Sequence, residues 1–343
     1  MTRKQLLIST ALIALVAVVL LIVPDGKKAT YHTDKGQVFG TYYAIQYESA
    51  DDLHDSIKTA FAAFDASMSM FNPQSTLSRI NAGTDSLADE FFVQMYRTAE
   101  DVNRLSKGAL DITVAPLVNL WGFGLKNRAH VEPEQVDALL PYVGMDKICL
   151  REEDGKAYLA KSDQHVQVDA GAIAKGQSCD VIAVLLSRCG CRNYLVDIGG
   201  EVVAKGYNPQ AKPWRIGITR PEDDASGVKN EVQSVLQTTN IALATSGNYR
   251  NFYYDGEQKR SHTIDPRTGY PVQHSLLSAT VRSNSCMRAD ALATACMVLG
   301  EEEALAMIEC DTLSACYLIV AVQDADTDST LLKTVSSSRW RDE

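Results

Sequence analysis

The sequence predicts an α+β fold, in which mixed β-sheets pack against helices. Apolar residues recur every three or four positions between residues 52 and 68, which is the period of an amphipathic helix. The dipeptides Asp154-Gly155 and Asp255-Gly256 lie between short runs of strand-forming residues, as in β-hairpins. Hairpins between helices, with neither strict β-α-β alternation nor a repeat of fixed period, favour α+β over a doubly wound sheet.

Length and composition indicate one large folded unit. The chain has 343 residues, of which 45% are hydrophobic and 22% charged, so it can bury a full core. No linker is visible between residues 37 and 335, which we interpret as one catalytic domain followed by a tail at 336–343. The net charge of −10 argues against a nucleic-acid partner, because phosphate backbones are bound by basic surfaces.

The N-terminus carries an apolar run from Leu6 to Val23, preceded by two basic residues. This run is near the lower limit of a membrane span and exceeds the core of a usual signal peptide. We predict that residues 1–24 are a signal anchor in the inner (cytoplasmic) membrane and that residues 25–36 are a linker. The domain would then face the periplasm or the outside. A cleaved signal peptide is the alternative.

Periodicity and turn signals place the other elements in order. In the first half we expect a strand at 38–47, helices at 52–68, 88–106 and 133–140, and a hairpin of strands at 147–151 and 157–160. In the second half we expect strands at 165–169, 194–198, 201–205, 214–219, 233–243, 276–282 and 316–322, a hairpin at 252–254 and 259–264, helices at 173–188, 287–299 and 302–309, and a last short strand. Gly108 and Gly190 end two of these helices and Pro133 opens a third, which are usual positions for these residues.

The eight cysteines permit disulfides if the chain is exported. Cys179 and Cys296, however, lie on apolar helix faces, where a free thiol behaves as a small hydrophobe. Cys189-Gly190-Cys191 lacks the spacing of a zinc knuckle. We expect mostly buried thiols, one or two bridges, and no metal bound through sulfur.

The stretch from Ser261 to Pro271 combines a histidine, an acid, an arginine, two prolines and a glycine. Neither a helix interior nor a central strand tolerates this, so we expect His262 to end a strand and residues 265–271 to form a rigid turn. Polar side chains on such a turn suit a ligand site. A structural corner, with His262 bonded to a backbone carbonyl, is the alternative.

Asp290 and Thr294 lie four residues apart on a predicted helix and therefore share one face. A carboxylate and a hydroxyl are hard oxygen ligands, which suit Mg²⁺ or Ca²⁺ and leave room for phosphate oxygens. Alternatively, Asp290 balances the helix dipole and Thr294 belongs to the core.

Small residues follow Asp169 just before a predicted helix, where a ligand can approach the backbone and an anion is favoured. Lys175 in the first turn is poorly placed for helix stability, so it has either a phosphate partner or solvent around it. Asp111 follows the Gly108 helix stop and either lines a site or caps the next segment. Phe39 and Phe71 are turn-like aromatics that stack on a planar ring or belong to the core.

Several ordered segments resemble one family, the ApbE-type FAD:protein FMN transferases. The resemblance covers residues 37–335 and rests on five blocks in the family's order. These blocks are residues 108–124 (GALDITVAPLVNLWGFG), 169–176 (DAGAIAKG), 246–250 (SGNYR), 261–271 (SHTIDPRTGYP) and 290–294 (DALAT). The resemblance implies an ApbE-like fold related to the T-fold.

The resemblance also implies an exported, membrane-linked enzyme that uses FAD and Mg²⁺. Such an enzyme attaches FMN to a threonine or serine hydroxyl of an acceptor protein through a phosphoester and releases AMP. The acceptors are typically subunits of membrane electron-transfer complexes. By residue-by-residue correspondence, the metal ligands would be the Ala172 carbonyl, Asp290 and Thr294. The FAD site would be lined by Phe39, Phe71, Ala109, Leu110, Asp111, Asp169, Lys175, Ser246, His262 and Ile264.

Two positions depart from the family pattern. Phe39 stands where methionine is usual, and Phe71 where tyrosine or tryptophan is frequent, so stacking survives but a hydroxyl contact from Phe71 is lost. Many relatives are lipoproteins, whereas the first cysteine of this chain is Cys149, so no lipid-accepting cysteine directly follows the apolar N-terminal run.

The implied chemistry suits these residues, because attack on a pyrophosphate needs charge neutralisation and an in-line nucleophile. We hypothesise that Asp290 acts through the metal and that His262 is the general base, with Asp290 and Asp169 as rivals for that role. Two other functions use nearly the same ligand set. One is Mg²⁺-dependent hydrolysis of FAD to FMN and AMP, and the other is FAD binding without chemistry by a periplasmic protein.

Overall fold

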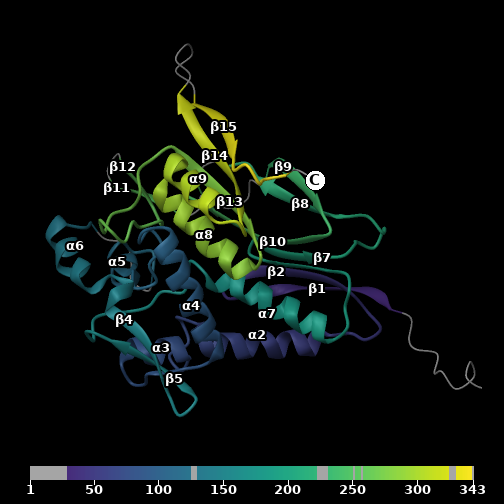
Figure 1. Ribbon diagram of the computed structural model, residues 1–343, viewed down its shortest axis with the longest axis horizontal. Helices are drawn as coiled ribbons and strands as arrows, with labels where there is room; N and C mark the ends of the chain where they lie inside the picture. The colour runs from purple at the N-terminus through teal and green to yellow at the C-terminus, as the bar shows by residue number, and fades with distance from the viewer. Residues whose placement is uncertain are drawn as a thin grey trace, which may run out of the picture.

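The computed structural model describes residues 29–124, 130–221, 231–249, 252–255, 258–323 and 330–341. Its centre is an eight-stranded sheet with helices over one face and a β-hairpin over the other (Figure 1). The helices are α2 (His54–Met68), α3 (Thr76–Ala82), α4 (Glu90–Leu105), α5 (Ala115–Leu120), α6 (Pro133–Leu139), α7 (Ala174–Arg188), α8 (Cys286–Leu299) and α9 (Glu301–Cys310). The α+β prediction is therefore confirmed.

The large sheet has the order β1-β2-β6-β7-β10-β13-β14-β15, and every neighbouring pair in it is antiparallel. Its strands are β1 (Thr30–Val38), β2 (Thr41–Ser49), β6 (Tyr194–Ile198), β7 (Glu201–Lys205), β10 (Asn240–Gly247), β13 (Leu276–Ser283), β14 (Ala315–Gln323) and β15 (Thr330–Ser336). Three smaller sheets contain β3 (Leu87–Ala88), β4 (Ile148–Glu153) and β5 (Lys156–Lys161); β8 (Trp214–Thr219) and β9 (Val232–Thr238); and β11 (Phe252–Asp255) and β12 (Gln258–Ser261).

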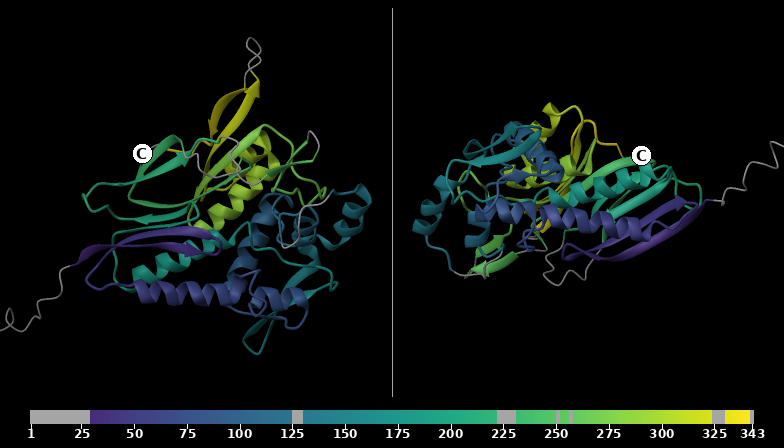
Figure 2. Two further views of the ribbon diagram at one scale, coloured as in Figure 1. Left: turned by 180° about the vertical axis from the view of Figure 1, so that it is seen from behind. Right: turned by 90° about the horizontal axis from the view of Figure 1, so that it is seen from below.

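The two faces of the large sheet bury different cores, because successive side chains of a strand point to opposite faces. On the helical face, Val196 and Ile198 pack with Phe61 of α2 and Ile182 of α7. On the other face, the core combines sheet residues with the β8–β9 hairpin; its members include Val202, Leu243, Trp214, Ile216 and Leu236. The view from below in Figure 2 separates the helical layer from the sheet.

Helices α7 and α8 pack closely although 97 residues lie between them in the sequence. Gly176 makes this approach possible, since a Cβ built there would lie 2.3 Å from the carbonyl oxygen of Cys286 and 2.8 Å from Cβ of Asp290. Asp180 joins the same helices by accepting hydrogen bonds from the backbone N–H groups of Cys286 and Met287, both at 2.9 Å. This seam determines the spacing of the side chains that project from the two helices.

The strand predictions depart from the structure near turns. The predicted linker at 25–36 contains most of β1, and the expected strand at 38–47 is β2, which begins only at Thr41, after Val38 has ended β1 and the chain has turned at Phe39 and Gly40. Both turn residues have positive φ, 51° and 74°, as two-residue hairpins require. The two strand predictions that fail are 233–243, which is two strands, β9 and β10, and 165–169, which forms only an isolated bridge between Gln167 and Val114.

Other departures concern the ends, α3 and the cysteines. Helix α3 was not predicted; Ser75 begins it by accepting a hydrogen bond from the Ser78 N–H. The presumed tail packs on the domain, because Ser337 and Trp340 are buried. All eight cysteines are unpaired, so the expected one or two bridges are not formed; five of the thiols are buried, as expected.

The predicted anchor at residues 1–24 lies outside the described residues. Within the described ranges, no helix has the length and apolar character needed to cross a membrane.

Candidate functional site

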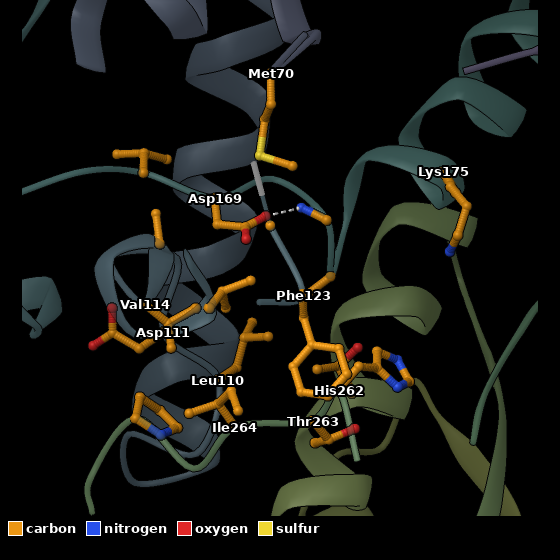
Figure 3. A pocket seen from close by; sticks show the side chains of 18 of the residues that line it. Met70, Leu110, Asp111, Val114, Phe123, Asp169, Lys175, His262, Thr263 and Ile264 are labelled. Atoms are coloured by element: carbon orange, nitrogen blue, oxygen red, sulfur yellow. Dashed lines mark hydrogen bonds between the residues drawn. The ribbon is translucent and has the colours of Figure 1, made fainter. Parts of the chain in front are cut away.

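A cavity of about 900 Å³ opens where seven sequence-distant segments meet. It is lined by parts of residues 70–82, 109–124, 167–175, 199–201, 245–249 and 262–266, and by α8. Figure 3 shows Lys175 on one side of this pocket and Leu110, Val114 and Ile264 on the other. The two sides differ in chemistry, so we name them separately.

The charged pole consists of Lys175, Glu201, Asp290 and Thr294, all of which line the cavity. Lys175 Nζ lies 2.7 Å from Oε1 of Glu201 and 3.7 Å from Oδ1 of Asp290. Both carboxyl groups are almost fully buried, with 2% and 1% of Glu201 and Asp290 exposed. Lys175 is thus paired with a buried acid and is not simply a solvated surface lysine, and it also lines the cavity, where a phosphate partner stays a prediction.

Burial and charge act against each other in this cluster. Burial acts to lower the pKa of the Lys175 ammonium, but the charges of Asp290 and Glu201 outweigh it and the pKa is raised. Burial raises the pKa of Glu201 to about 7, although the Lys175 ammonium opposes the shift. Oε2 of Glu201 is buried and has no hydrogen-bond partner in the structure. The cluster therefore carries one more carboxyl group than its single ammonium neutralises.

Oxygen donors at this pole fit a hard divalent cation. Asp290 Oδ2 accepts a hydrogen bond from the Gly176 N–H at 3.0 Å, while Oδ1 faces Lys175 beyond ordinary hydrogen-bond distance. The Thr294 hydroxyl lies 3.3 Å from that of Ser246, and Ala172 lines the same cavity. Among the described residues, no three His, Cys, Asp or Glu side chains are grouped to hold a metal ion, so a cation bound beside Asp290 would need a hydroxyl or a carbonyl as a further ligand. Such a set of oxygens suits Mg²⁺.

The apolar pole consists of Leu110, Val114, Val118, Phe123 and Ile264. It is built on α5 and on the turn that follows β12, and a buried tryptophan ties the two segments together. Trp121 Nε1 donates a hydrogen bond of 2.8 Å to the carbonyl of Gly269, and the Arg260 guanidinium lies 5.2 Å from the Trp121 ring. A largely apolar wall of this kind suits a planar organic group.

His262 follows β12 directly, as the sequence predicts, and lines the cavity beside Phe123 (Figure 3). The turn after it is rigid: the Gly269 N–H donates to the Asp265 carbonyl at 2.8 Å, and Gly269 has a φ of 84°. The Thr263 hydroxyl donates to the Asn248 side chain at 2.7 Å. These bonds hold the imidazole at the cavity wall.

The two acids on the opposite wall are engaged by backbone donors. Asp111 Oδ1 accepts from the N–H and hydroxyl of Thr113, and Oδ2 accepts from the Met145 N–H. Asp169 Oδ1 accepts a 2.6 Å bond from the Gly171 N–H. Burial raises the pKa of both carboxyl groups. Asp111 therefore caps the segment that follows it, and it also lines the cavity. Both of the roles considered for Asp111 from the sequence thus apply.

Nearly all of the residues expected at the site line the cavity. They are Phe71, Ala109, Leu110, Asp111, Asp169, Ala172, Lys175, Ser246, His262, Ile264, Asp290 and Thr294. Phe39 is the exception: its ring packs edge-on against Phe61 and Phe64, and Phe39 is not among the lining residues. The positive φ at the hairpin turn directs it into that aromatic cluster.

Several lining residues were not anticipated, among them Met70, Phe123, Glu201, Thr245 and Tyr249. The available signal for Glu201 was its place directly after Gly199-Gly200, at the end of a predicted strand. Phe123 belongs to the 108–124 block that carries the family resemblance, but only Ala109, Leu110 and Asp111 of that block were expected at the site.

A cavity with an oxygen-rich charged pole and an apolar pole defines an enzyme class that handles elongated ligands carrying both anionic and planar groups. A model of the ApbE family matches residues 39–318. The chain belongs to the ApbE family, and it is a transferase.

Two curated relatives are named FAD:protein FMN transferase. The protein of Haemophilus influenzae is 37% identical over 320 residues, covering 89% of this chain and 91% of the relative. That of Vibrio cholerae is also 37% identical over 320 residues, covering 90% and 93%. The solved structure of the flavin transferase ApbE from Vibrio cholerae superimposes with a TM-score of 0.77 at 36% identity, covering 90% of this chain and 98% of that one.

Proposed function

We propose that this protein transfers FMN from FAD to a threonine or serine hydroxyl of an acceptor protein, forming a phosphoester and releasing AMP in an Mg²⁺-dependent reaction. The observation that carries the proposal is the charged pole, where Asp290, Thr294 and Lys175 meet at one end of a cavity with an apolar far wall. The names of the relatives support FAD as substrate and a protein as acceptor.

The pyrophosphate of FAD would lie at the charged pole. There the Lys175 ammonium supplies a positive charge, and the hydroxyl of Ser246 supplies a hydrogen-bond donor. Asp290, Thr294 and the Ala172 carbonyl would hold Mg²⁺, which neutralises charge on the transferred phosphoryl group when it is bound. The flavin would lie against the apolar pole near Ile264 and His262, with the exposed Phe71 ring at the cavity wall.

In the proposed step, the acceptor hydroxyl oxygen bonds to the phosphorus of the FMN half. The bond from that phosphorus to the bridging oxygen breaks, and AMP leaves with this oxygen. The hydroxyl proton passes to His262, since the imidazole lines the cavity and a histidine side chain can act as a general base. Asp290 and Asp169, which line the same cavity, are the rival candidates for this role.

We further propose that residues 1–24 anchor the enzyme in the cytoplasmic membrane and that the acceptor is a membrane electron-transfer subunit on the same side as the domain. The support is the apolar run from Leu6 to Val23 together with the family resemblance.

The test is an incubation of the full chain with FAD and an acceptor protein first shown to gain FMN with the Vibrio cholerae relative. AMP release and acceptor mass are followed with and without Mg²⁺, with a hydroxyl-less variant of the acceptor as control. We expect an acceptor heavier by one FMN only when Mg²⁺ and the hydroxyl are present.

Two results would replace the proposal. AMP and free FMN without acceptor labelling would indicate an FAD hydrolase. Tight FAD binding without AMP release would indicate a carrier. For the base, a His262→Ala variant that binds FAD and transfers FMN at the wild-type rate would contradict the role of His262.

A further inference from the structure

A second cavity, of about 430 Å³, lies beside the first. It runs between the β8–β9 hairpin and the face of the large sheet that the helices leave uncovered. We call it the β8 groove and define it by Tyr42, Asp197, Val202, Arg215, Val232 and Leu243.

The groove adjoins the main cavity. Gly199, Thr245 and Tyr249 line both. Thr245 directly precedes Ser246, whose hydroxyl lies 3.3 Å from that of Thr294. The groove therefore meets the main cavity at the charged pole and not at the apolar pole.

Strand geometry explains this junction. Ile198 pairs with Glu201 and Asp197 with Val202, so Glu201 points to the helical face and Asp197 to the groove. β7 begins at Glu201, whereas β10 continues to Gly247, which leaves a step in the sheet at the Gly199-Gly200 turn. Gly200 has a φ of 101°, and a Cβ built on it would meet no atom within 4 Å. Gly199 of this turn lines both cavities, so the two cavities lie next to each other at the step.

The walls of the groove combine apolar surface with unpaired charge. Tyr42 and Val232 are 50% and 59% exposed, which is high for large apolar side chains. The Asp197 carboxylate is partly buried and accepts one hydrogen bond, from the Gly200 N–H at 3.0 Å. Within the described part of the chain, Arg215 is exposed and its side chain forms no hydrogen bond or ion pair. The groove thus offers a hydrogen-bond acceptor in Asp197, a hydrogen-bond donor in Arg215 and apolar surface. An extended peptide can use all three kinds of contact.

We propose that the β8 groove binds the segment of the acceptor polypeptide that carries the modified hydroxyl. The inference rests on the proposed function, because the FAD:protein FMN transferases that resemble this chain need a polypeptide at the pyrophosphate. The groove has less than half the volume of the main cavity, so it suits a few residues of chain and not a second dinucleotide. A peptide lying in it would present a hydroxyl over Thr245 to the charged pole.

The test compares the double variant Arg215→Glu/Val232→Asp with the control Arg151→Glu/Leu331→Asp, in the full chain. The control makes the same kinds of change at exposed residues of β4 and β15, outside both cavities. The probe is the acceptor protein that gains FMN with the Vibrio cholerae relative. We expect kcat/KM for the acceptor to fall roughly tenfold or more in the groove variant, mainly through KM. Affinity for FAD and acceptor-independent AMP release should be unchanged, and the control should match the wild type.

Hydrogen exchange gives a readout that does not depend on turnover. Addition of the acceptor should slow exchange in β8 and in β9 of the wild type and not of the groove variant. Protection elsewhere, or equal kcat/KM in the groove variant and the wild type, would overturn the inference while leaving the transferase intact. Weaker FAD binding with an unchanged acceptor KM would also overturn it, because the groove would then hold part of FAD. A wild type that labels no acceptor would refute the proposed function, and the groove inference with it.

Discussion

The charged pole and the apolar pole of the cavity are positioned by different kinds of structure. The charged pole depends on the seam between α7 and α8, where Gly176 and Asp180 set the distance between two long helices. The apolar pole depends on α5 and on a proline-rich turn, which the Trp121–Gly269 hydrogen bond holds together. Charged groups must be held at short, defined distances from one another, so they need rigid supporting elements. An apolar wall makes less directional contacts and tolerates a less regular support. Substitutions at the two poles should therefore have separable effects.

The largest effect is expected from Asp290→Asn, which removes the carboxylate on which the proposed metal set depends. Because metal-based charge stabilisation amounts to several kcal/mol, FMN transfer should fall by roughly 10²- to 10³-fold. FAD affinity should fall much less, since the apolar pole is intact. Steady-state kinetics and flavin fluorescence measure the two effects.

The matched control for that variant is Asp180→Asn, a buried acid of the same helical seam that does not line the cavity. It should keep most of the transfer activity. Equal losses in the two variants would mean that Asp290 acts only through the seam.

The next effect concerns pH. Burial raises the pKa of Asp180 to about 6 from an ordinary value of 3.8, so the folded state binds a proton more tightly than the unfolded state. The stability from this group is present below pH 3.8 and is lost as the pH rises through 6. Between pH about 4 and about 7, the unfolding free energy of the wild type should fall relative to Asp180→Asn by on the order of 3 kcal/mol. Urea unfolding of both proteins across this range measures the difference, and parallel curves would exclude the shift.

Gly176→Ala tests the seam itself. The added Cβ would meet a backbone carbonyl at 2.3 Å, so α7 and α8 must separate, which costs about 1–3 kcal/mol of unfolding free energy. The rate of FMN transfer should also fall, because Lys175 and Asp290 move apart. Gly217→Ala is the control for stability only, since its Cβ would meet only the side chain of Val232 at 3.5 Å and Gly217 lines the β8 groove. A Gly176→Ala protein as stable as this control and as active as the wild type would show that the seam tolerates the extra methyl group.

The smallest effect belongs to the apolar pole. Trp121→Phe removes the hydrogen bond to Gly269 and weakens the stacking of Arg260, for a loss of about 1 kcal/mol of stability. Trp214→Phe removes a similar bond, to the Lys205 carbonyl at 3.0 Å, away from the cavity. The two variants should lose similar stability in thermal unfolding, but FAD affinity should weaken only in Trp121→Phe. Unchanged affinity for FAD in both variants would mean that the turn after β12 keeps its position without the Trp121–Gly269 hydrogen bond.

Much of the site was predictable because its residues lie in short local patterns. Asp290 and Thr294 share a helix face by spacing alone, and two prolines restrict the turn after His262 whatever surrounds it. Glu201 was not predictable in the same way. A single glutamate after two glycines has no periodicity, and its partner Lys175 lies on another element.

The sequence by itself determined the helices, most of the strands and the order of the site segments, because these depend on the period of apolar residues and on prolines and glycines. Only the tertiary structure decided that Lys175 pairs with Glu201, that Phe39 turns away from the cavity, and that the sheet opens at Gly199-Gly200 into a groove. These features depend on contacts between distant segments and on two positive φ angles at a turn. The spacing of residues along the chain does not predict these features, because they form only when the sheet and the α7–α8 seam are assembled.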